Sequence, residues 1–199
     1  METYTAFTSG FGLDAMVEVG GKAAHLGDLT RAGFRTPPGF SVKVQAMDAF
    51  LEANRLHGPI REIASSIDFG RMSEVEEKTS RIRVLITGAG LPEAIAAEIR
   101  DGYRRLGDGG PPPLVAVRSS VGTRDISRSS FPGQMDTYHN LRGEEEVLEC
   151  VKACWASLWS SRAACTLHAA GIDPRAVVVA PLVQRMVPAE TAGVLFTAN

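Results

Sequence analysis

The sequence has few cysteines, little net charge and no long apolar run, and each of these absences argues against a class of protein. Its three cysteines are too few for a disulfide framework and are typical of a reducing cytoplasm. No apolar run is long enough to cross a bilayer, and the first residues lack the basic and apolar regions of a signal peptide. The formal net charge is -2, so we expect neither nucleic acid nor a membrane as a partner. We therefore expect a cytoplasmic protein in which any anion site is a local feature.

What is present is the composition of an ordinary folded domain, over a chain long enough to bury a sizeable core. Helical periodicity and end signals predict helices over residues 23–29, 46–56, 72–87, 92–106 and 144–169. Alternating or apolar runs predict strands over residues 40–44, 114–118, 136–141, 177–187 and 193–197, the last two as antiparallel neighbours. Residues 57–59 are expected to stop the second helix, and the helix over 144–169 is expected to be the longest. The Gly/Pro-rich residues 107–113 form either a hinge between two lobes or a plain loop.

A short apolar strand ends in an arginine and two hydroxyls, Arg118-Ser119-Ser120, and a polar loop then returns through Gly133. A fixed cation, hydroxyl donors and exposed backbone N–H groups at the end of a strand are how proteins hold a polyphosphate. The alternatives are a structural ion pair of Arg118 with Asp125 or Asp136, and a mobile surface loop. The residues alone leave these interpretations open.

A second candidate is Lys22, which follows two glycines and opens a helix. Glycines allow a close approach of the backbone to a ligand, and the N-terminus of a helix attracts anions. The spacing is not that of a Walker A motif, so a P-loop is excluded. The alternative is a flexible turn that carries a solvated lysine.

The third candidate segment, residues 181–187, is an apolar strand with a polar interruption at Gln184 and Arg185. An adenine ring fits an apolar slot with backbone donors and acceptors along one edge, which a strand leaving the sheet through Met186 and Val187 would provide. The alternative is an ordinary buried strand. None of the histidines has the spacing of metal ligands, so we expect no metal site within the chain.

Together these segments resemble the N-terminal nucleotide-binding domain of the phosphoenolpyruvate synthase and pyruvate phosphate dikinase family, which includes rifampicin phosphotransferase. They stand in the family's order over nearly the whole chain. The segments that carry the resemblance are Gly20-Gly21-Lys22-Ala23-Ala24-His25-Leu26-Gly27, Thr36-Pro37-Pro38-Gly39-Phe40, Val115-Ala116-Val117-Arg118-Ser119-Ser120, Ser130-Phe131-Pro132-Gly133-Gln134, Cys154-Trp155-Ala156-Ser157-Leu158-Trp159, Gln184-Arg185-Met186-Val187 and Ala192-Gly193-Val194-Leu195-Phe196-Thr197.

The resemblance implies an α+β fold of the ATP-grasp type, with a mixed or antiparallel sheet and flanking helices, of which residues 1–199 would be the N-terminal part. It assigns contacts with the phosphates of ATP to Lys22 and Arg118, which would be the catalytic residues. The ATP-binding positions that it implies are Lys22, Arg118, Ser119, Gly133, Thr137, Gln184, Met186 and Val187.

The family reaction splits ATP to AMP and carries the β-phosphate on a histidine of a separate domain, which passes it to pyruvate or to a drug hydroxyl. The resemblance places the Mg²⁺ ligands and that histidine domain beyond this chain, so we expect the isolated chain to have little or no activity. The sequence departs from the family pattern at two places: Arg124-Asp125 stands in place of an acidic pair, and Pro132 in place of an alanine.

Two functions of different classes follow. The first is the ATP-binding portion of a phosphotransferase, with the missing ATP-grasp segment and the phosphohistidine domain as its partners. The alternative is a truncated, non-catalytic nucleotide-binding or interaction module.

Overall fold

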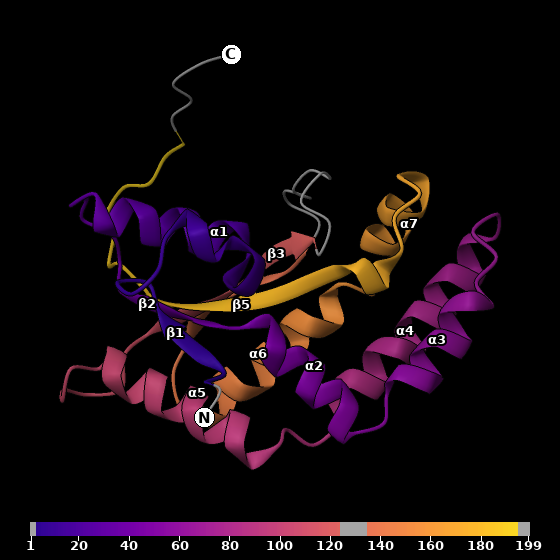
Figure 1. Ribbon diagram of the computed structural model, residues 1–199, viewed down its shortest axis with the longest axis horizontal. Coiled ribbons are helices and arrows are strands. Elements are labelled where there is room, and N and C mark those ends of the chain that lie inside the picture. The colour runs from indigo at the N-terminus through magenta and orange to yellow at the C-terminus, as the bar shows by residue number, and fades with distance from the viewer. Residues whose placement is uncertain (1–2, 124–134, 195–199) are drawn as a thin grey trace.

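The computed structural model describes residues 3–123 and 135–194, and within them an antiparallel five-stranded sheet is flanked by helices (Figure 1). The strands lie in the order β1-β2-β5-β3-β4, and every neighbouring pair is antiparallel. This confirms the predicted sheet with flanking helices. The strands are β1 (Thr5–Phe7), β2 (Gly39–Val42), β3 (Val115–Thr123), β4 (Thr137–Leu141) and β5 (Val177–Arg185). The α-helices are α1 (Met16–Arg31), α2 (Val44–Ala53), α3 (His57–Ser65), α4 (Met72–Gly88), α5 (Glu93–Leu106), α6 (Glu144–Ser157) and α7 (Ser161–Ala169), and the short 3-10 helices are η1 (Leu13–Ala15) and η2 (Pro174–Ala176).

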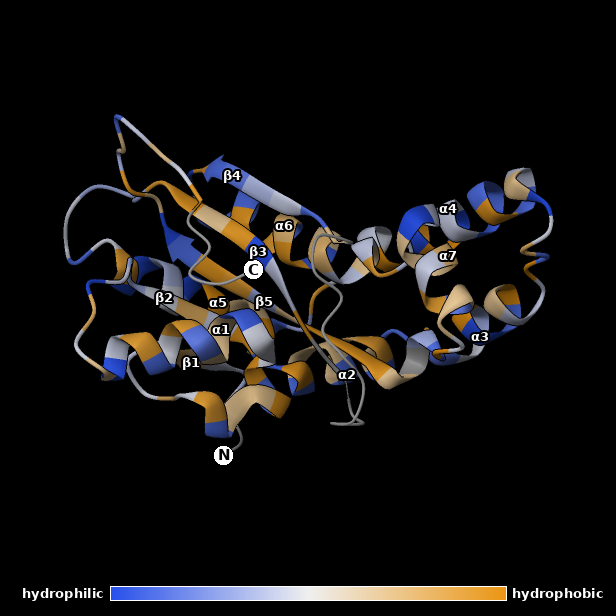
Figure 2. Cartoon of the chain, turned by 90° about the horizontal axis from the view of Figure 1, so that it is seen from above, coloured by the Kyte–Doolittle hydropathy of each residue, from blue (hydrophilic) through white to orange (hydrophobic). Residues whose placement is uncertain are grey.

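The two faces of the sheet are covered by different helices, because side chains alternate between the faces along each strand. On β5, Val179 and Val183 enter the large core beneath α2, α5 and α6, whereas Leu182 packs with Val19 and Ala23 of α1 on the other face. Figure 1 shows α1 above the sheet, α2, α5 and α6 below it, and α7 beyond one end of β5. The hydropathy colouring of β3 and β5 in Figure 2 agrees with strands that are buried on both sides. Among the described helices, α1 is the one that covers the face of Leu182, and the candidate site lies on that face.

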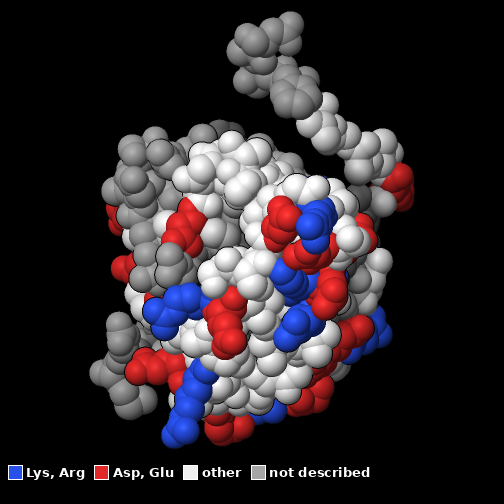
Figure 3. Space-filling view, turned by 90° about the vertical axis from the view of Figure 1, so that its right-hand side faces the viewer, with Lys and Arg blue, Asp and Glu red and all other residues white. Residues whose placement is uncertain are grey.

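The large core is centred on aromatic side chains that are fully buried. The rings of Phe50 on α2 and Trp155 on α6 lie 5.0 Å apart, and Phe40 of β2 is buried beside them in the same cluster. Burying one such side chain stabilises the fold by about 2–3 kcal/mol. Helices α3, α4 and α7 extend from the far end of α6, where the surface in Figure 3 intermingles acidic and basic side chains without a large patch of one sign. No helix of the described residues is long and apolar enough to cross a membrane.

The prediction of one long helix over residues 144–169 is wrong, because the chain breaks between α6 and α7. The hydroxyl of Ser160 accepts a hydrogen bond from the backbone N–H of Ala163 at 3.2 Å and so caps a new helix. The longest helix is α4 instead. The apolar spacing continues across the break, which is why periodicity alone did not show it.

The prediction that residues 57–59 stop a helix is also wrong, since α3 begins at His57. Helix α2 ends earlier, and Arg55 turns the chain with a φ of 53°. Pro59 lies in the first turn of α3, where a backbone N–H has no partner within the helix, so proline is tolerated there. Strand β1 and the first turn of α1 were not predicted at all.

Two predictions concern segments near the ends of elements. Of the strand expected over residues 193–197, Gly193 and Val194 lie outside any strand, and residues 195–197 lie outside the described residues.

The Gly/Pro-rich segment 107–113 connects α5 to β3. Leu106 at the end of α5 and Val115 at the start of β3 belong to the same core cluster. The hydroxyl of Tyr103 donates to the carbonyl of Pro113 at 2.9 Å and ties the segment back to α5. A division into lobes at this segment stays a prediction.

Candidate functional site

Lys22 and Arg118 lie side by side where α1 crosses β3. The ammonium of Lys22 donates a hydrogen bond of 2.7 Å to the carbonyl oxygen of Ser119, the neighbour of Arg118. The guanidinium of Arg118 is near enough to repel that ammonium electrostatically. Two basic side chains that are distant in the sequence therefore meet on the α1 face of the sheet.

The glycines before Lys22 allow α1 to come this close to β3. Gly20 has φ 75° and ψ 164°, which kinks the helix in a conformation that side chains rarely permit. A Cβ atom at Gly20 would lie 2.5 Å from the hydroxyl oxygen of Ser120. Beyond the kink, the backbone N–H of Ala23 donates to that same hydroxyl at 3.2 Å. The contact between Gly20 and Ser120 thus determines where along β3 the side chain of Lys22 projects from α1.

The charge at the site is positive among the residues that the structure describes. Burial of the ammonium end, followed by repulsion from Arg118, lowers the pKa of Lys22 below its usual value. Within the described residues, no carboxylate forms an ion pair with either cation. The ion pair considered for Arg118 is absent as far as Asp136 is concerned, because that carboxylate approaches Arg162 instead, at 4.0 Å; Asp125 lies outside the described residues. An anion placed between Lys22 and Arg118 would relieve their repulsion.

Arg118 is held by a neutral partner, the side-chain amide of Gln184. Its NH1 atom donates to Oε1 of Gln184 at 2.8 Å. In the strand register Arg118 pairs with Thr137 on β4, and Gln184 pairs with Ala116 on β3. Since residues two apart on a strand share a face, Arg118, Thr137 and Gln184 all lie on the α1 face. The structure therefore brings four of the predicted positions together: Lys22, Arg118, Thr137 and Gln184.

Ser119 is placed differently from the expectation that its hydroxyl meets the ligand. Its side chain is fully buried on the opposite face, where the hydroxyl donates to the carbonyl of Asp136 at 2.9 Å and lies 3.4 Å from the hydroxyl of Ser157. What Ser119 presents to the candidate site is its carbonyl oxygen, which Lys22 occupies. Ser120, one residue further, is the serine whose hydroxyl lies on the α1 face.

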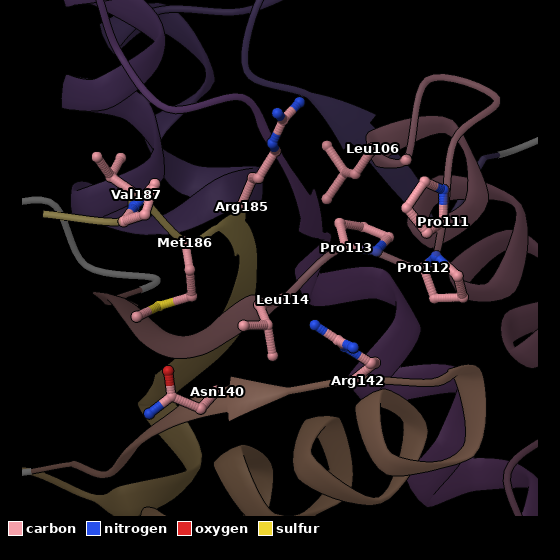
Figure 4. Close-up of a pocket in the computed structure, with 12 residues that line it drawn as sticks. Leu106, Pro111, Pro112, Pro113, Leu114, Asn140, Arg142, Arg185, Met186 and Val187 are labelled. Carbon is pink, nitrogen blue, oxygen red and sulfur yellow. The ribbon is translucent and has the colours of Figure 1, made fainter.

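Met186 and Val187 follow the end of β5 and line a cavity of about 420 Å³ at that end of the sheet (Figure 4). The backbone N–H of Met186 donates to the carbonyl of Leu114 at 2.8 Å, so this N–H is already used. Val187 is largely exposed. The walls are mainly apolar, and Asn140, Arg142 and Arg185 supply the polar groups. The other lining residues are Leu106, Gly107, Pro111, Pro112, Pro113, Leu114 and Pro188.

Some predicted positions cannot be placed. Gly133, Pro132 and Arg124 lie outside the described residues, so the loop expected to cover the triphosphate stays a prediction. In the part of the chain that the structure does describe, no group of three or more His, Cys, Asp or Glu side chains could hold a metal ion. Burial raises the pKa of the Cys154 thiol to about 12, which suits a core residue and not a nucleophile.

The fold and this cluster define an α+β domain with a paired-cation site on one face of its sheet. Comparison with known proteins gives the family: residues 16–199 match the family described as "Pyruvate phosphate dikinase, AMP/ATP-binding domain". The chain belongs to this family. The earlier resemblance to phosphoenolpyruvate synthase and rifampicin phosphotransferase is thereby confirmed.

Three curated relatives show the range of the family. A probable phosphoenolpyruvate synthase of Methanothermobacter thermautotrophicus is 38% identical over 201 residues, which cover 100% of this chain and 29% of that protein. A probable phosphoenolpyruvate synthase of Staphylothermus marinus is 43% identical, with 92% of this chain and 22% of that protein covered. A rifampicin phosphotransferase of a Streptomyces species is 38% identical, with 92% of this chain and 21% of that protein covered. The chain thus spans less than a third of the length of each of these relatives.

Proposed function

We propose that this chain is the ATP-binding portion of a phosphotransferase of the ATP-grasp type, which passes a phosphoryl group from ATP through a phosphohistidine to an acceptor. The observation that carries the proposal is the meeting of Lys22 with Arg118 over β3. The names of the relatives suggest pyruvate or a drug hydroxyl as the acceptor. The histidine and the acceptor site would belong to the parts of those longer proteins that this chain does not cover.

The two cations suit a polyphosphate because they are close together and, among the described residues, have no acidic partner. Phosphoryl transfer spreads negative charge over the phosphate oxygens, and fixed positive groups that stabilise this charge accelerate the reaction. The planar guanidinium of Arg118 can bind two oxygens at once, while the ammonium of Lys22 acts as a point charge. Mg²⁺ would neutralise further charge between the phosphates, and we propose that its ligands lie in the rest of the protein.

The cavity beside Met186 and Val187 supports a position for the base. It is lined mainly by apolar groups, as adenine requires. Arg118 stands four positions after Leu114, which lines the cavity, so the two are about 13 Å apart along the strand. An extended nucleotide can bridge such a gap, with the base in the cavity and the phosphates between the cations. Because the N–H of Met186 is bonded to Leu114, we propose that the N–H of Val187 is the one that contacts the base.

The first experiment is calorimetric titration of the chain with ATP. Replacing Arg118 or Lys22 with alanine should weaken binding about 10- to 100-fold each, as expected for the loss of a charge-assisted hydrogen bond. Arg81→Ala, on the exposed side of α4, is the matched control and should leave the affinity unchanged. Equal affinities for the wild type and Arg118→Ala would contradict the proposal.

A second experiment separates the base position from the phosphate position. Leu114→Trp should fill the cavity while its backbone carbonyl still accepts from Met186. We expect this variant to lose ATP affinity but to bind inorganic triphosphate as the wild type does. Loss of both affinities would indicate a general disturbance of the site, and loss of neither would place the base elsewhere.

A further inference from the structure

Another cavity, of about 310 Å³, opens between α2 and α3 over the first residues of β5. Its floor is apolar, and the residues of the floor belong to the large core, where each of them is less than a tenth exposed. They are Met47, Ile60, Leu158, Trp159 and Val177. The volume is at the lower end of the range of ligand pockets, about 300–1,000 Å³, so the cavity suits a small molecule with an apolar body.

The two helical walls of this cavity carry different charges. Asp48 and Glu52 line it from α2, where residues four positions apart share one side of the helix. His57 and Arg61 line it from α3 with the same spacing. Glu52 and Arg61 are exposed, and within the described part of the chain no ion pair joins them to each other or to another residue. The cavity thus has an acidic wall on α2 and a basic wall on α3, above one apolar floor.

This arrangement selects a ligand with three kinds of group. A carboxylate suits Arg61, because the planar guanidinium can bind both carboxylate oxygens at once. An ammonium suits Glu52 on the other wall, since a carboxylate accepts charge-assisted hydrogen bonds from it. An apolar side chain suits the floor, where its removal from water favours binding. A ligand with a single charge would satisfy one wall and leave the other without a partner.

We propose that this cavity binds a free α-amino acid with a large apolar side chain. Its carboxylate lies at Arg61, its ammonium lies at Glu52, and its side chain packs on Met47, Ile60 and Trp159. An α-amino acid carries both charges next to one apolar group, and the small volume matches a single residue of this kind.

The cavity is separate from the candidate site for ATP. Val177 on its floor begins β5, whereas Met186 follows the end of that strand, about 30 Å away along it. Lys22 and Arg118 do not line this cavity. The amino-acid site therefore stands or falls independently of ATP binding.

Tryptophan fluorescence reports on the cavity, because Trp159 lines it and the other tryptophan of the chain, Trp155, is fully buried in the core. Titration with L-leucine should give a saturable change in emission, and Trp159→Phe should lose that change. A change that persists in Trp159→Phe would place the leucine elsewhere and overturn the proposal. A wild-type chain that gives no saturable change with leucine, methionine or phenylalanine at millimolar concentration would also overturn it.

Three relatives of leucine test the three contacts. Isocaproate lacks the ammonium, L-leucinamide lacks the charged carboxylate, and glycine lacks the apolar side chain. Each should bind the wild-type chain at least tenfold more weakly than L-leucine, through the loss of a charge-assisted hydrogen bond or of apolar burial. Any of the three that binds as tightly as L-leucine would contradict the contact assigned to the group it lacks.

Two charge variants assign the ends of the ligand. Glu52→Gln should weaken L-leucine binding about tenfold and should not weaken isocaproate, which has no ammonium. Arg61→Gln should weaken L-leucine about tenfold and should not weaken L-leucinamide, which has no carboxylate. Equal losses for all the ligands in either variant would contradict the proposed contacts. Glu77→Gln and Arg81→Gln, on the exposed side of α4, are the matched controls and should leave every affinity unchanged.

Leu51→Trp tests the location by filling the cavity. Leu51 lines the cavity and is partly exposed, so a larger ring can enter this space without displacing the core. We expect calorimetry to show no binding of L-leucine, while circular dichroism shows the variant folded. Val84→Trp adds the same ring at an exposed position of α4 and should leave the affinity unchanged. An unchanged leucine affinity in Leu51→Trp would show that the ligand does not occupy this cavity.

Discussion

Ser120 accepts a hydrogen bond from the backbone N–H of Ala23, and its hydroxyl lies where a side chain at Gly20 would have to stand. This contact joins the helix that carries Lys22 to the strand that carries Arg118. The relative position of the two cations therefore depends on a glycine and a serine that carry no charge.

Gly20→Ala should destabilise the chain by about 1–3 kcal/mol, because the new methyl group meets Ser120 and the φ of 75° is strained for alanine. Denaturation in urea measures the change. Gly88→Ala is the control: it lies in the last turn of α4 with nothing within 4 Å of the added methyl group, and it should leave stability unchanged or raise it slightly. Equal stabilities of Gly20→Ala and the wild type would show that the close contact is unimportant.

ATP binding should be coupled to proton uptake by Lys22 at alkaline pH. In the free chain, burial and the charge of Arg118 lower the pKa of Lys22, so part of the population is neutral at pH values approaching 10.5. Phosphate oxygens favour the charged form and raise that pKa, so binding takes up a proton in this window. Calorimetry in buffers of different ionisation enthalpy should detect the uptake in the wild type and not in Lys22→Met. The uptake should become smaller as the pH is lowered, because more of Lys22 is then already charged in the free chain.

The same pKa shift predicts how the stability of the free chain depends on pH. A lysine whose folded pKa is lowered binds more protons in the unfolded chain, so stability should rise as the pH increases through the window below 10.5. Urea denaturation of the wild type and of Lys22→Met at several alkaline pH values measures this slope. We expect a smaller slope for Lys22→Met, since the shifted group is absent, and identical slopes would contradict the cause given for the shift.

Lys152 of α6 caps the C-terminus of α4, and its removal should destabilise the fold without altering the candidate site. Its ammonium donates to the carbonyls of Thr87 at 2.9 Å and Ala89 at 3.3 Å, and it pairs with Glu149 at 3.0 Å. Lys152→Met keeps the apolar stem but leaves these carbonyls without their donor, at a cost of about 1–3 kcal/mol. We expect a lower midpoint in urea and an unchanged ATP affinity. Arg81→Met, on the exposed side of α4, is the comparison and should cost less.

Ser160→Ala tests the break between α6 and α7. The variant loses the cap to Ala163, which is worth about 1 kcal/mol. Ser160→Asp keeps an acceptor at the same position and should retain most of the stability, whereas Ser65→Ala, at the exposed end of α3, should have little effect. If Ser160→Ala and Ser160→Asp are equally stable, the hydroxyl does not determine the break.

The elements that sequence analysis predicted well are those whose pattern depends on burial. The apolar run of β5 and the helical spacing of α4 and α5 follow from the core that they enter, so periodicity found them. The break at Ser160 was missed because the apolar spacing of the helix continues through it. The start of α3 does not follow from the sequence pattern, because Pro59 suits both the end of one helix and the first turn of the next.

At the candidate site, the sequence pattern indicates the two cations but not the groups that hold them in place. Lys22 follows two glycines, and Arg118 ends an apolar run, where a charge is costly unless it has a partner. These local settings indicate both residues as candidates. The hydrogen bond from the side-chain amide of Gln184 to the carbonyl of Pro37 joins residues 147 positions apart and exists only because β2 and β5 are neighbours in register. The side chains of Ser119 and Ser120 point to opposite faces of β3, because neighbouring residues of a strand alternate between its faces. Which of the two faces α1 does not follow from the sequence.

Strand β5 lies third in the sheet, hydrogen-bonded to β2 on one side and to β3 on the other, and it carries Gln184 near its end. A strand with partners on both edges opens to solvent only when much of the domain unfolds, so its amide hydrogens should be among the last to exchange. The sheet around β5 is therefore expected to be one of the parts of the described chain that open least readily. If a nucleotide binds as proposed, any closure around it would have to come from elements packed on the sheet, while the sheet itself stays in place.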